Sequence, residues 1–358
     1  MLLAAGGTGG HLFPAEALAA ELAKRGVAVE LATDARAVGY GGKFPARATH
    51  VIPSATPRGP FGYVKAGAVI ALGVAKAHRL LGRLRPAAVV GFGGYPSIPA
   101  VLAAGLRRIP SVIHEQNGVM GRANRLLASR VTAIATSFAG VVDASPALAG
   151  KATRTGNPLR PAVVAAIAPY VPPAPNGTLR LLAFGGSQGA RIMADVVPPA
   201  VERLDPALRA RLSVVQQARS EDLERVRSTY ARLGMAAEVA PFFLDLPTRI
   251  AAAHLVVSRS GASTVAELAA LGRPVVLVPL PHALDQDQLA NARVLETAGG
   301  AILLRQDAFT PERLAREIAA LAADAARLAA MAAGARSAGA PDAAERLAAL
   351  VMKVAKIL

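Results

Sequence analysis

A concentration of polar groups suited to ligand binding lies in the stretch Ser258–Asn291, SRSGASTVAELAALGRPVVLVPLPHALDQDQLAN. The apolar residues 254–257 predict a strand, a turn of small residues follows, and Ser263–Leu271 is predicted to be a helix. A second strand, Pro274–Pro279, leads into a loop of hydroxyl, amide and carboxylate side chains. Parallel α/β sheets bind ligands in the loops at the carboxyl ends of their strands. We therefore expect this stretch to form one half of an active site.

A glycine-rich loop near the N-terminus predicts a phosphate site. Met1–Ala5 is expected to be a short strand, Gly6–His11 a loop, and the residues up to Arg25 a helix with Pro14 in its first turn. Backbone amides in such a loop approach a phosphate closely, and the helix dipole favours its negative charge. The spacing does not match the dinucleotide pattern G-x-G-x-x-G, and a tight turn that binds nothing is the alternative interpretation.

Two more polar loops are expected in the first half of the chain. Gly91–Pro96 follows an apolar strand at 87–90, and His114–Gly118 follows another at 111–113. Three such loops after three strands indicate one shared crevice. For His114 and Glu115 taken singly, hydrogen bonding within the loop is the simpler interpretation.

The length of 358 residues suits two domains. A proline-rich segment, 156–178, marks their boundary, and the strand expected at 179–184 again meets a glycine loop, Gly185–Ala190. The sequence therefore predicts an α/β fold with a first domain at 1–158 and a second at 159–341. A terminal helix, 342–358, is expected to pack back across both.

Composition restricts the chemistry and the partners. The chain has no cysteine, which excludes disulfides, thiolate metal sites and a cysteine nucleophile. Its formal charge of +16 indicates anionic partners, unless it reflects only a genomic bias toward arginine. Nucleic acid is not expected, since only 4% of residues are aromatic and no basic cluster with a base-stacking platform is evident.

Two segments bear on a membrane. The N-terminus lacks the features of a secretory signal, and the uncharged run 86–106 is interrupted by prolines and glycines, so it is expected to be a strand, a loop and a helix. Residues 63–85 predict a helix with an apolar side and basic flanks that include Lys65, Lys76 and Arg79. Such a helix could rest on an anionic bilayer or could simply pack on the core.

Six motifs occur in order along nearly the whole chain. They are Gly7–His11 (GTGGH), Gly93–Tyr95 (GGY), His114–Asn117 (HEQN), Gly156–Arg160 (GNPLR), Gly185–Ala190 (GGSQGA) and Arg259–Ala262 (RSGA), the last followed by Thr264 and Glu267. Together they resemble the bacterial MurG family, the peptidoglycan N-acetylglucosaminyltransferases. The first strand is shorter than in that family, and residues 39–62 follow it only loosely.

The resemblance implies a GT-B fold, in which two Rossmann-like domains with parallel sheets face a cleft. It implies inverting transfer of GlcNAc from UDP-GlcNAc to the C4 hydroxyl of the muramoyl group of lipid I, an undecaprenyl diphosphate, to give lipid II. No cofactor and no metal are implied. Asp285 and Asp287 have the D-x-D spacing of metal-dependent transferases of another fold, but this loop resembles a hydroxyl-binding one.

The resemblance also implies roles for individual residues. Donor binding is expected at Thr8, Gly9, Gly10, Asn117, Arg160, Ser187, Leu244, Ala262, Ser263, Thr264, Glu267 and Gln288. Acceptor binding is expected at Gly9, Gly10, His11, Gly93, Gly94 and Tyr95. Ser187 and Arg160 would hold the diphosphate, the backbone of Leu244 the uracil, and Gln288 a hydroxyl of the donor sugar.

Three residues carry the chemistry expected of the site. His11 is the first candidate for the general base, because an unperturbed histidine titrates near neutrality, and Glu115 is the second. His11 could instead only orient the diphosphate. Glu267 is expected to accept both ribose hydroxyls, and its alternative role is a capping box with Thr264.

The resemblance places the protein on the cytoplasmic face of the inner membrane as a peripheral protein. Its expected partners are UDP-GlcNAc, lipid I, the anionic membrane surface and other proteins of cell-wall synthesis. A GT-B enzyme with another nucleotide sugar or acceptor is the main alternative. A nicotinamide-dependent oxidoreductase would need G-x-G-x-x-G, which neither half provides.

Overall fold

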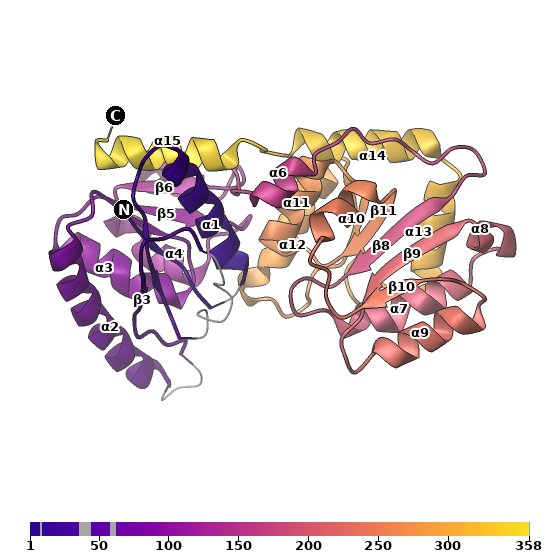
Figure 1. The fold of residues 1–358 in the computed structure, drawn as a ribbon, viewed down its shortest axis with the longest axis horizontal. Helices are drawn as coiled ribbons and strands as arrows, with labels where there is room; N and C mark the ends of the chain where they lie inside the picture. Colours follow the sequence, from indigo (N-terminus) through magenta and orange to yellow (C-terminus); the bar gives the residue numbers. More distant parts are fainter. Residues whose placement is uncertain (8, 36–43, 58–61, 358) are drawn as a thin grey trace. The chain divides into compact units, whose positions relative to one another are not determined.

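The structure is a computed structural model, and it describes residues 1–7, 9–35, 44–57 and 62–357. The chain divides into two compact units, each built around one parallel sheet (Figure 1). Unit 1 is Met1–Pro161 with Ala340–Leu358, and unit 2 is Ala162–Gly339. The short helix α6, Pro161–Ala165, lies at the division between them.

Unit 1 contains a seven-stranded parallel sheet in the order β3-β2-β1-β4-β5-β6-β7. Its strands are β1 Leu2–Ala4, β2 Glu30–Thr33, β3 Thr49–Val51, β4 Val89–Gly91, β5 Ser111–Glu115, β6 Ala133–Thr136 and β7 Ala152–Arg154. Its α-helices are α1 Gly9–Lys24, α2 Gly62–Leu84, α3 Ile98–Leu106, α4 Arg122–Leu127, α5 Pro146–Ala149 and α15 Ala343–Ala355.

The sheet of unit 1 is covered on both faces because its central strands are apolar on both sides. Along β1 and the residue that follows it, Leu2 and Ala4 belong to one buried cluster, and Leu3 and Ala5 belong to another, as the two-residue period of a strand requires. The first cluster includes residues of α2, α3 and α4, and the second includes residues of α1 and α15. The terminal helix α15, yellow in Figure 1, therefore buries its apolar side in unit 1.

The predicted first strand and helix are present, but Pro14 is not where the sequence placed it. The helix α1 begins at Gly9, so Pro14 is its sixth residue and lies in the second turn. The glycines were expected to remain in the loop, and instead Gly9 and Gly10 already form the first turn. The helix thus reaches further toward the glycine-rich loop than the sequence indicated.

Unit 2 contains a six-stranded parallel sheet in the order β10-β9-β8-β11-β12-β13. Its strands are β8 Leu179–Phe184, β9 Leu212–Gln217, β10 Glu238–Ala240, β11 Leu255–Ser258, β12 Val275–Leu277 and β13 Ala301–Leu303. Its other helices are α7 Arg191–Glu202, α8 Pro206–Ala210, α9 Leu223–Arg232, α10 Leu246–Ala252, α11 Ala262–Leu271, α12 Asp287–Thr297, α13 Pro311–Ala322 and α14 Ala325–Ser337.

The uncharged segment 86–106 forms strand β4, a 3₁₀ turn at Tyr95–Ser97 and helix α3, as the sequence predicts. The amphipathic segment 63–85 is confirmed as helix α2, with one side in the core of unit 1 and Tyr63, Val64 and Leu72 exposed on the other. Within the described ranges, no single helix is long and apolar enough to cross a membrane, and one bent pair, α13 with α14, meets the criteria of length and composition.

Candidate active site

The glycine-rich loops lie at the points where the strand order of each sheet reverses. In unit 1, β1 and β4 are neighbours, and the loops that follow them contain Gly7 and the pair Gly93–Gly94. In unit 2, β8 and β11 are neighbours, and Gly185–Ala190 and Arg259–Gly261 follow them. Doubly wound sheets bind ligands in the crevice at this reversal. Each unit therefore presents a candidate ligand site at the carboxyl edge of its own sheet.

In unit 1, the ring of His11 lies directly against the backbone of the Gly93–Gly94 turn. Both glycines have positive φ angles, +80° and +68°. A β-carbon added at Gly94 would lie 3.2 Å from Nε2 and Cδ2 of His11, closer than ordinary contacts. Only glycine therefore suits this turn, both for its backbone and for the space that the imidazole fills. The structure brings together His11, Gly93 and Gly94, three of the residues expected at the acceptor.

A buried amide of the HEQN segment contacts the same imidazole. Gln116 Nε2 lies 2.9 Å from the carbonyl oxygen of Phe92, to which it donates, and 3.2 Å from His11 Nδ1. Burial lowers the pKa of His11 below its usual value, and a hydrogen bond with the Phe92 carbonyl raises it in part. His11 is therefore neutral at pH 7 and able to accept a proton.

Which nitrogen of His11 is free depends on its tautomer. If Gln116 donates to Nδ1, the neutral ring carries its proton on Nε2 and that atom cannot accept another. If Nδ1–H donates to the Phe92 carbonyl instead, Nε2 keeps its lone pair. Base chemistry at Nε2 requires the second arrangement. Gln116 was not singled out in the sequence, although it lies between two motif residues that were.

Glu115 lies inside strand β5 and is buried, so its assignment to a loop was wrong. Its Oε1 accepts from the backbone N (2.9 Å) and Nδ2 (3.2 Å) of Asn117. Its Oε2 accepts from Gly121 N at 2.9 Å and Asn124 Nδ2 at 2.8 Å. Burial raises the pKa of Glu115, and these four donors partly offset that effect. The carboxylate thus holds the segment that follows β5.

His114 also lies in β5 rather than in a loop, and it is fully buried. Its Nε2 lies 3.0 Å from the carbonyl oxygen of Gly156, and its ring is 5.6 Å from that of Phe92. Burial lowers the pKa of His114 to about 4, so it is neutral at pH 7 and donates through Nε2. A buried, neutral histidine bonded to the backbone has a structural role.

The remaining predicted residues of unit 1 lie in three places. Asn117 is half-buried beside Glu115, and Tyr95 begins the 3₁₀ turn after Gly94. Arg160 was assigned to the second domain, but it lies in unit 1 with its guanidinium 4.4 Å from the ring centre of Phe13. Thr8 lies outside the described residues.

In unit 2, the loop with Ser187 leads into the N-terminus of α7. Gly186 and Gly189 have φ angles of +88° and +66°, and Ser187 is exposed. The N-cap residue of α7 is Ala190, whose methyl side chain cannot accept from the first amides of the helix. The first amides of this helix are therefore available to an anion, and the helix dipole favours its charge.

Helix α11 carries four of the predicted donor residues: Ala262, Ser263, Thr264 and Glu267. Its N-cap is Gly261, so Thr264 is the third helical residue and the capping-box alternative for Glu267 is wrong. Glu267 is largely buried, and Ser263 Oγ has no hydrogen-bond partner among the described residues.

The first turns of α12 are bonded to the turn after β11. Ser260 Oγ donates to the carbonyl of Gln288 at 2.8 Å, and Asn291 Nδ2 donates to the carbonyl of Ser260 at 3.2 Å. The side chain of Gln288 accepts from Leu280 N through Oε1 at 3.1 Å, which orients its amide. The structure therefore joins Gln288 to the start of α11. Asp285 and Gln286 have left-handed backbones, with φ of 57° and 52°.

The loop after β10 is joined to the Ser187 loop by a residue that the sequence did not indicate. Gln217, at the end of β9, accepts from Gly185 N at 2.9 Å and donates to the Pro241 carbonyl at 3.1 Å. The loop after β10 carries Leu244, which is highly exposed. Only the sheet order, with β9 between β8 and β10, brings these segments together.

Comparison with known proteins identifies the family. Residues 1–136 match the glycosyltransferase family 28 N-terminal domain, and residues 180–347 match its C-terminal domain. A protein of Rhodopseudomonas palustris is 62% identical over 360 residues, which cover 100% of this chain and 98% of the relative. That relative is named UDP-N-acetylglucosamine--N-acetylmuramyl-(pentapeptide) pyrophosphoryl-undecaprenol N-acetylglucosamine transferase. The chain belongs to the MurG family.

Other MurG relatives agree along the whole length. A protein of the same name from Bradyrhizobium diazoefficiens is 61% identical and covers 99% of this chain and 98% of its own. The crystal structure of Acinetobacter baumannii MurG is 30% identical, with a TM-score of 0.79 and coverage of 98% of both chains. The expected GT-B fold, with its two parallel sheets, is confirmed by this MurG structure.

Proposed function

We propose that this chain transfers GlcNAc from UDP-GlcNAc to the C4 hydroxyl of the muramoyl group of lipid I, and that lipid II forms with inversion at the sugar carbon. One observation carries the proposal. Two sheets each present glycine-rich loops at a strand-order reversal, in a chain that matches named transferases of this reaction along its full length.

The donor is assigned to unit 2. The exposed Ser187 loop and the uncapped start of α7 suit a diphosphate, because backbone amides and the helix dipole both favour negative charge. Glu267, on α11, has two oxygens that can accept from both ribose hydroxyls. Gln288, oriented through Leu280, can donate from its amide N–H groups to a hydroxyl of the sugar. These groups would also stabilise UDP as it leaves with its negative charge.

The acceptor is assigned to unit 1. The first turn of α1, with Gly9 and Gly10, and the Gly93–Gly94 turn lie beside His11, where the lipid diphosphate would meet backbone amides. His11, with its lowered pKa, is the proposed base that removes the C4 hydroxyl proton as the sugar carbon is attacked. Glu115 is proposed to hold Asn117 in place rather than to accept that proton, because four donors already occupy its oxygens.

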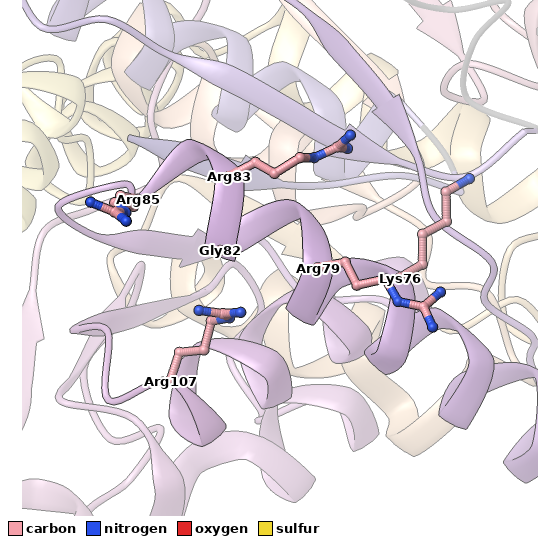
Figure 2. A pocket seen from close by; sticks show the side chains of 6 residues that line it. All are labelled: Lys76, Arg79, Gly82, Arg83, Arg85 and Arg107. Atoms are coloured by element: carbon pink, nitrogen blue, oxygen red, sulfur yellow. The ribbon is translucent and has the colours of Figure 1, made fainter.

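Membrane attachment is proposed to use α2 and the start of the loop after α3. A cavity of about 590 Å³ is lined by Lys76, Arg79, Gly82, Arg83, Arg85 and Arg107, none of which is acidic (Figure 2). Arg107 lies against the helix at Gly82, where a β-carbon would come within 2.4 Å of its guanidinium, and it donates to the His78 carbonyl at 2.7 Å. The cations of this pocket would bind phosphates of the anionic inner leaflet.

Binding to vesicles tests the membrane assignment. We expect Lys76→Gln with Arg79→Gln to weaken binding to anionic vesicles roughly 30-fold, since each cation near the surface contributes about 1 kcal/mol. Arg316→Gln with Arg327→Gln, which removes the same charge from exposed sites of unit 2, is the control. Equal losses in both variants, or a loss in neither, would reject the pocket.

The choice of donor distinguishes the proposal from its main alternative. Calorimetric titration of the full chain should give tighter binding of UDP-GlcNAc than of UDP-glucose or GDP-mannose. A preference for another nucleotide sugar would instead identify a different GT-B transferase.

A further inference from the structure

The loop at residues 241–244 presents two large apolar side chains to solvent. Leu244 is 92% exposed and Phe242 is 55% exposed, whereas Phe243 between them is buried. The loop follows β10 at the carboxyl edge of the sheet, which is the edge that binds ligands in folds of this type. A loop that is exposed at its tip and ordered at its base suits the binding of a flat, partly apolar group.

One side chain of α10 contacts the first residue of β10, the buried phenylalanine of this loop and the residue that follows the loop. Arg249 Nη1 donates to Glu238 Oε2 at 2.6 Å, before the loop, and its Nε donates to Asp245 Oδ1 at 2.7 Å, after the loop. Its guanidinium also lies 4.3 Å from the ring centre of Phe243. Arg249 thus fixes the residues on either side of Leu244.

These contacts contribute little to the stability of the fold. The carboxylates of Glu238 and Asp245 are both 55% exposed, and ion pairs with exposed partners contribute little to stability. Asp245 occupies the N-cap position of α10, but its side chain does not cap the helix and bonds to Arg249 instead. The side chain of Asp245 therefore holds the end of the loop through Arg249 and does not cap α10.

The other end of the loop is held from the neighbouring strand. Gln217 donates to the Pro241 carbonyl and accepts from Gly185 N, so the loop is bonded to the glycine turn assigned to the donor diphosphate. Between Pro241 and Asp245, the backbone of Phe243 and Leu244 is confined on both sides. Its amide and carbonyl groups can therefore offer a fixed pattern of donors and acceptors to the edge of a base.

We propose that Arg249 is a positioning residue that holds the Phe243–Leu244 backbone in the geometry that recognises the uracil of the donor. The inference rests on the proposed function, because it needs a uridine nucleotide in unit 2. It adds a residue outside the shared motifs, acting through the loop and not by touching the nucleotide. Base recognition depends on Arg249, and recognition of the diphosphate does not.

The test compares Arg249→Met and Arg249→Lys in the full chain, with Arg313→Met as control. Arg313 forms a similar pair on α13, with Glu317 at 2.7 Å, away from the loop. By calorimetric titration, Arg249→Met should bind UDP at least 10-fold more weakly than wild type and bind inorganic pyrophosphate equally well. The ratio of the affinities for UDP and CDP should be smaller in Arg249→Met than in wild type, and Arg249→Lys should recover part of this ratio. Arg313→Met should match wild type in its affinity for UDP, its affinity for pyrophosphate and its preference for UDP over CDP.

Two results would overturn the role of Arg249 and leave the proposed function intact. In the first, Arg249→Met binds UDP with wild-type affinity; in the second, it loses affinity for UDP and for pyrophosphate by the same factor. The second result would make Arg249 a general support of unit 2, and a lowered thermal unfolding temperature would accompany it. Failure of the proposed function is recognisable separately, because wild-type protein would then not bind UDP at all.

Discussion

Replacing Glu115 with Gln distinguishes two possible roles of this residue: support of the segment after β5, and proton transfer in the reaction. Each oxygen of Glu115 accepts two N–H groups, from Asn117 on one side and from Gly121 and Asn124 on the other. Glutamine has the same shape but only one acceptor oxygen. The NH₂ group of the glutamine must face one of the two pairs of N–H donors. Two hydrogen bonds are therefore lost, and the N–H groups of the glutamine face N–H groups of the protein.

The magnitude follows from the charge of the acceptor. Hydrogen bonds to charged groups contribute about 1.5–3 kcal/mol, so the loss of two destabilises the 111–127 segment by about 3 kcal/mol or more. Hydrogen exchange through local opening would then be about 100-fold faster in that segment. Mass spectrometry of Glu115→Gln at neutral pH measures this, alongside kcat and KM for transfer. Glu312→Gln, on an exposed carboxylate paired with Arg203, is the control and should exchange like wild type.

The opposite pattern would refute this reasoning. If Glu115→Gln exchanges like wild type in 111–127 but loses kcat with KM unchanged, Glu115 is the proton acceptor and the four hydrogen bonds are incidental. The role proposed for His11 would then have to be withdrawn.

Three more predictions follow from the site residues. Glu267→Ala should weaken UDP-GlcNAc binding about 100-fold, the loss of two charge-assisted hydrogen bonds, with an unchanged circular dichroism spectrum; wild-type affinity would remove the ribose assignment. Burial lowers the pKa of His11, so the acid limb of the pH profile of kcat/KM should lie below pH 6.5. In Gln116→Glu, the new carboxylate should accept from His11 Nδ1–H and shift this limb to higher pH. An acid limb at the wild-type pH would show that His11 is not the base. His114 has a pKa of about 4 in the fold against 6.5 unfolded, so the unfolded chain binds its proton first as the pH falls. Stability should drop by about 3 kcal/mol between pH 6.5 and 4, and a drop of the same size in His114→Asn would contradict this.

Much of the scaffold could be predicted because its signals are local. An apolar run, a glycine loop and an amphipathic stretch predict β1 and α1, and an amphipathic stretch alone predicts α2. Motif spacing likewise indicated the residues of α11. These features depend on the order of neighbouring residues, which the sequence states directly.

The errors concern residues whose partners are distant or unusual. His114 and Glu115 are polar, which suggests a loop, but they complete a buried strand. The Gly156 carbonyl accepts from Nε2 of His114, and the 117–124 segment donates to both oxygens of Glu115. The capping box at Thr264 has the right spacing, yet the N-cap of that helix is Gly261. Gln217 joins two loops only because β9 lies between β8 and β10. No periodicity in the sequence encodes such pairings.

The most direct test of the central claim is the transfer itself. The full chain is mixed with radiolabelled UDP-GlcNAc and a short-chain lipid I analogue in the presence of a chelator, and the lipid fraction is examined by chromatography and mass spectrometry. The account predicts label in a lipid-linked disaccharide, formed in proportion to the UDP released. Release of UDP without label in the lipid, or label only in the absence of lipid I, would contradict it.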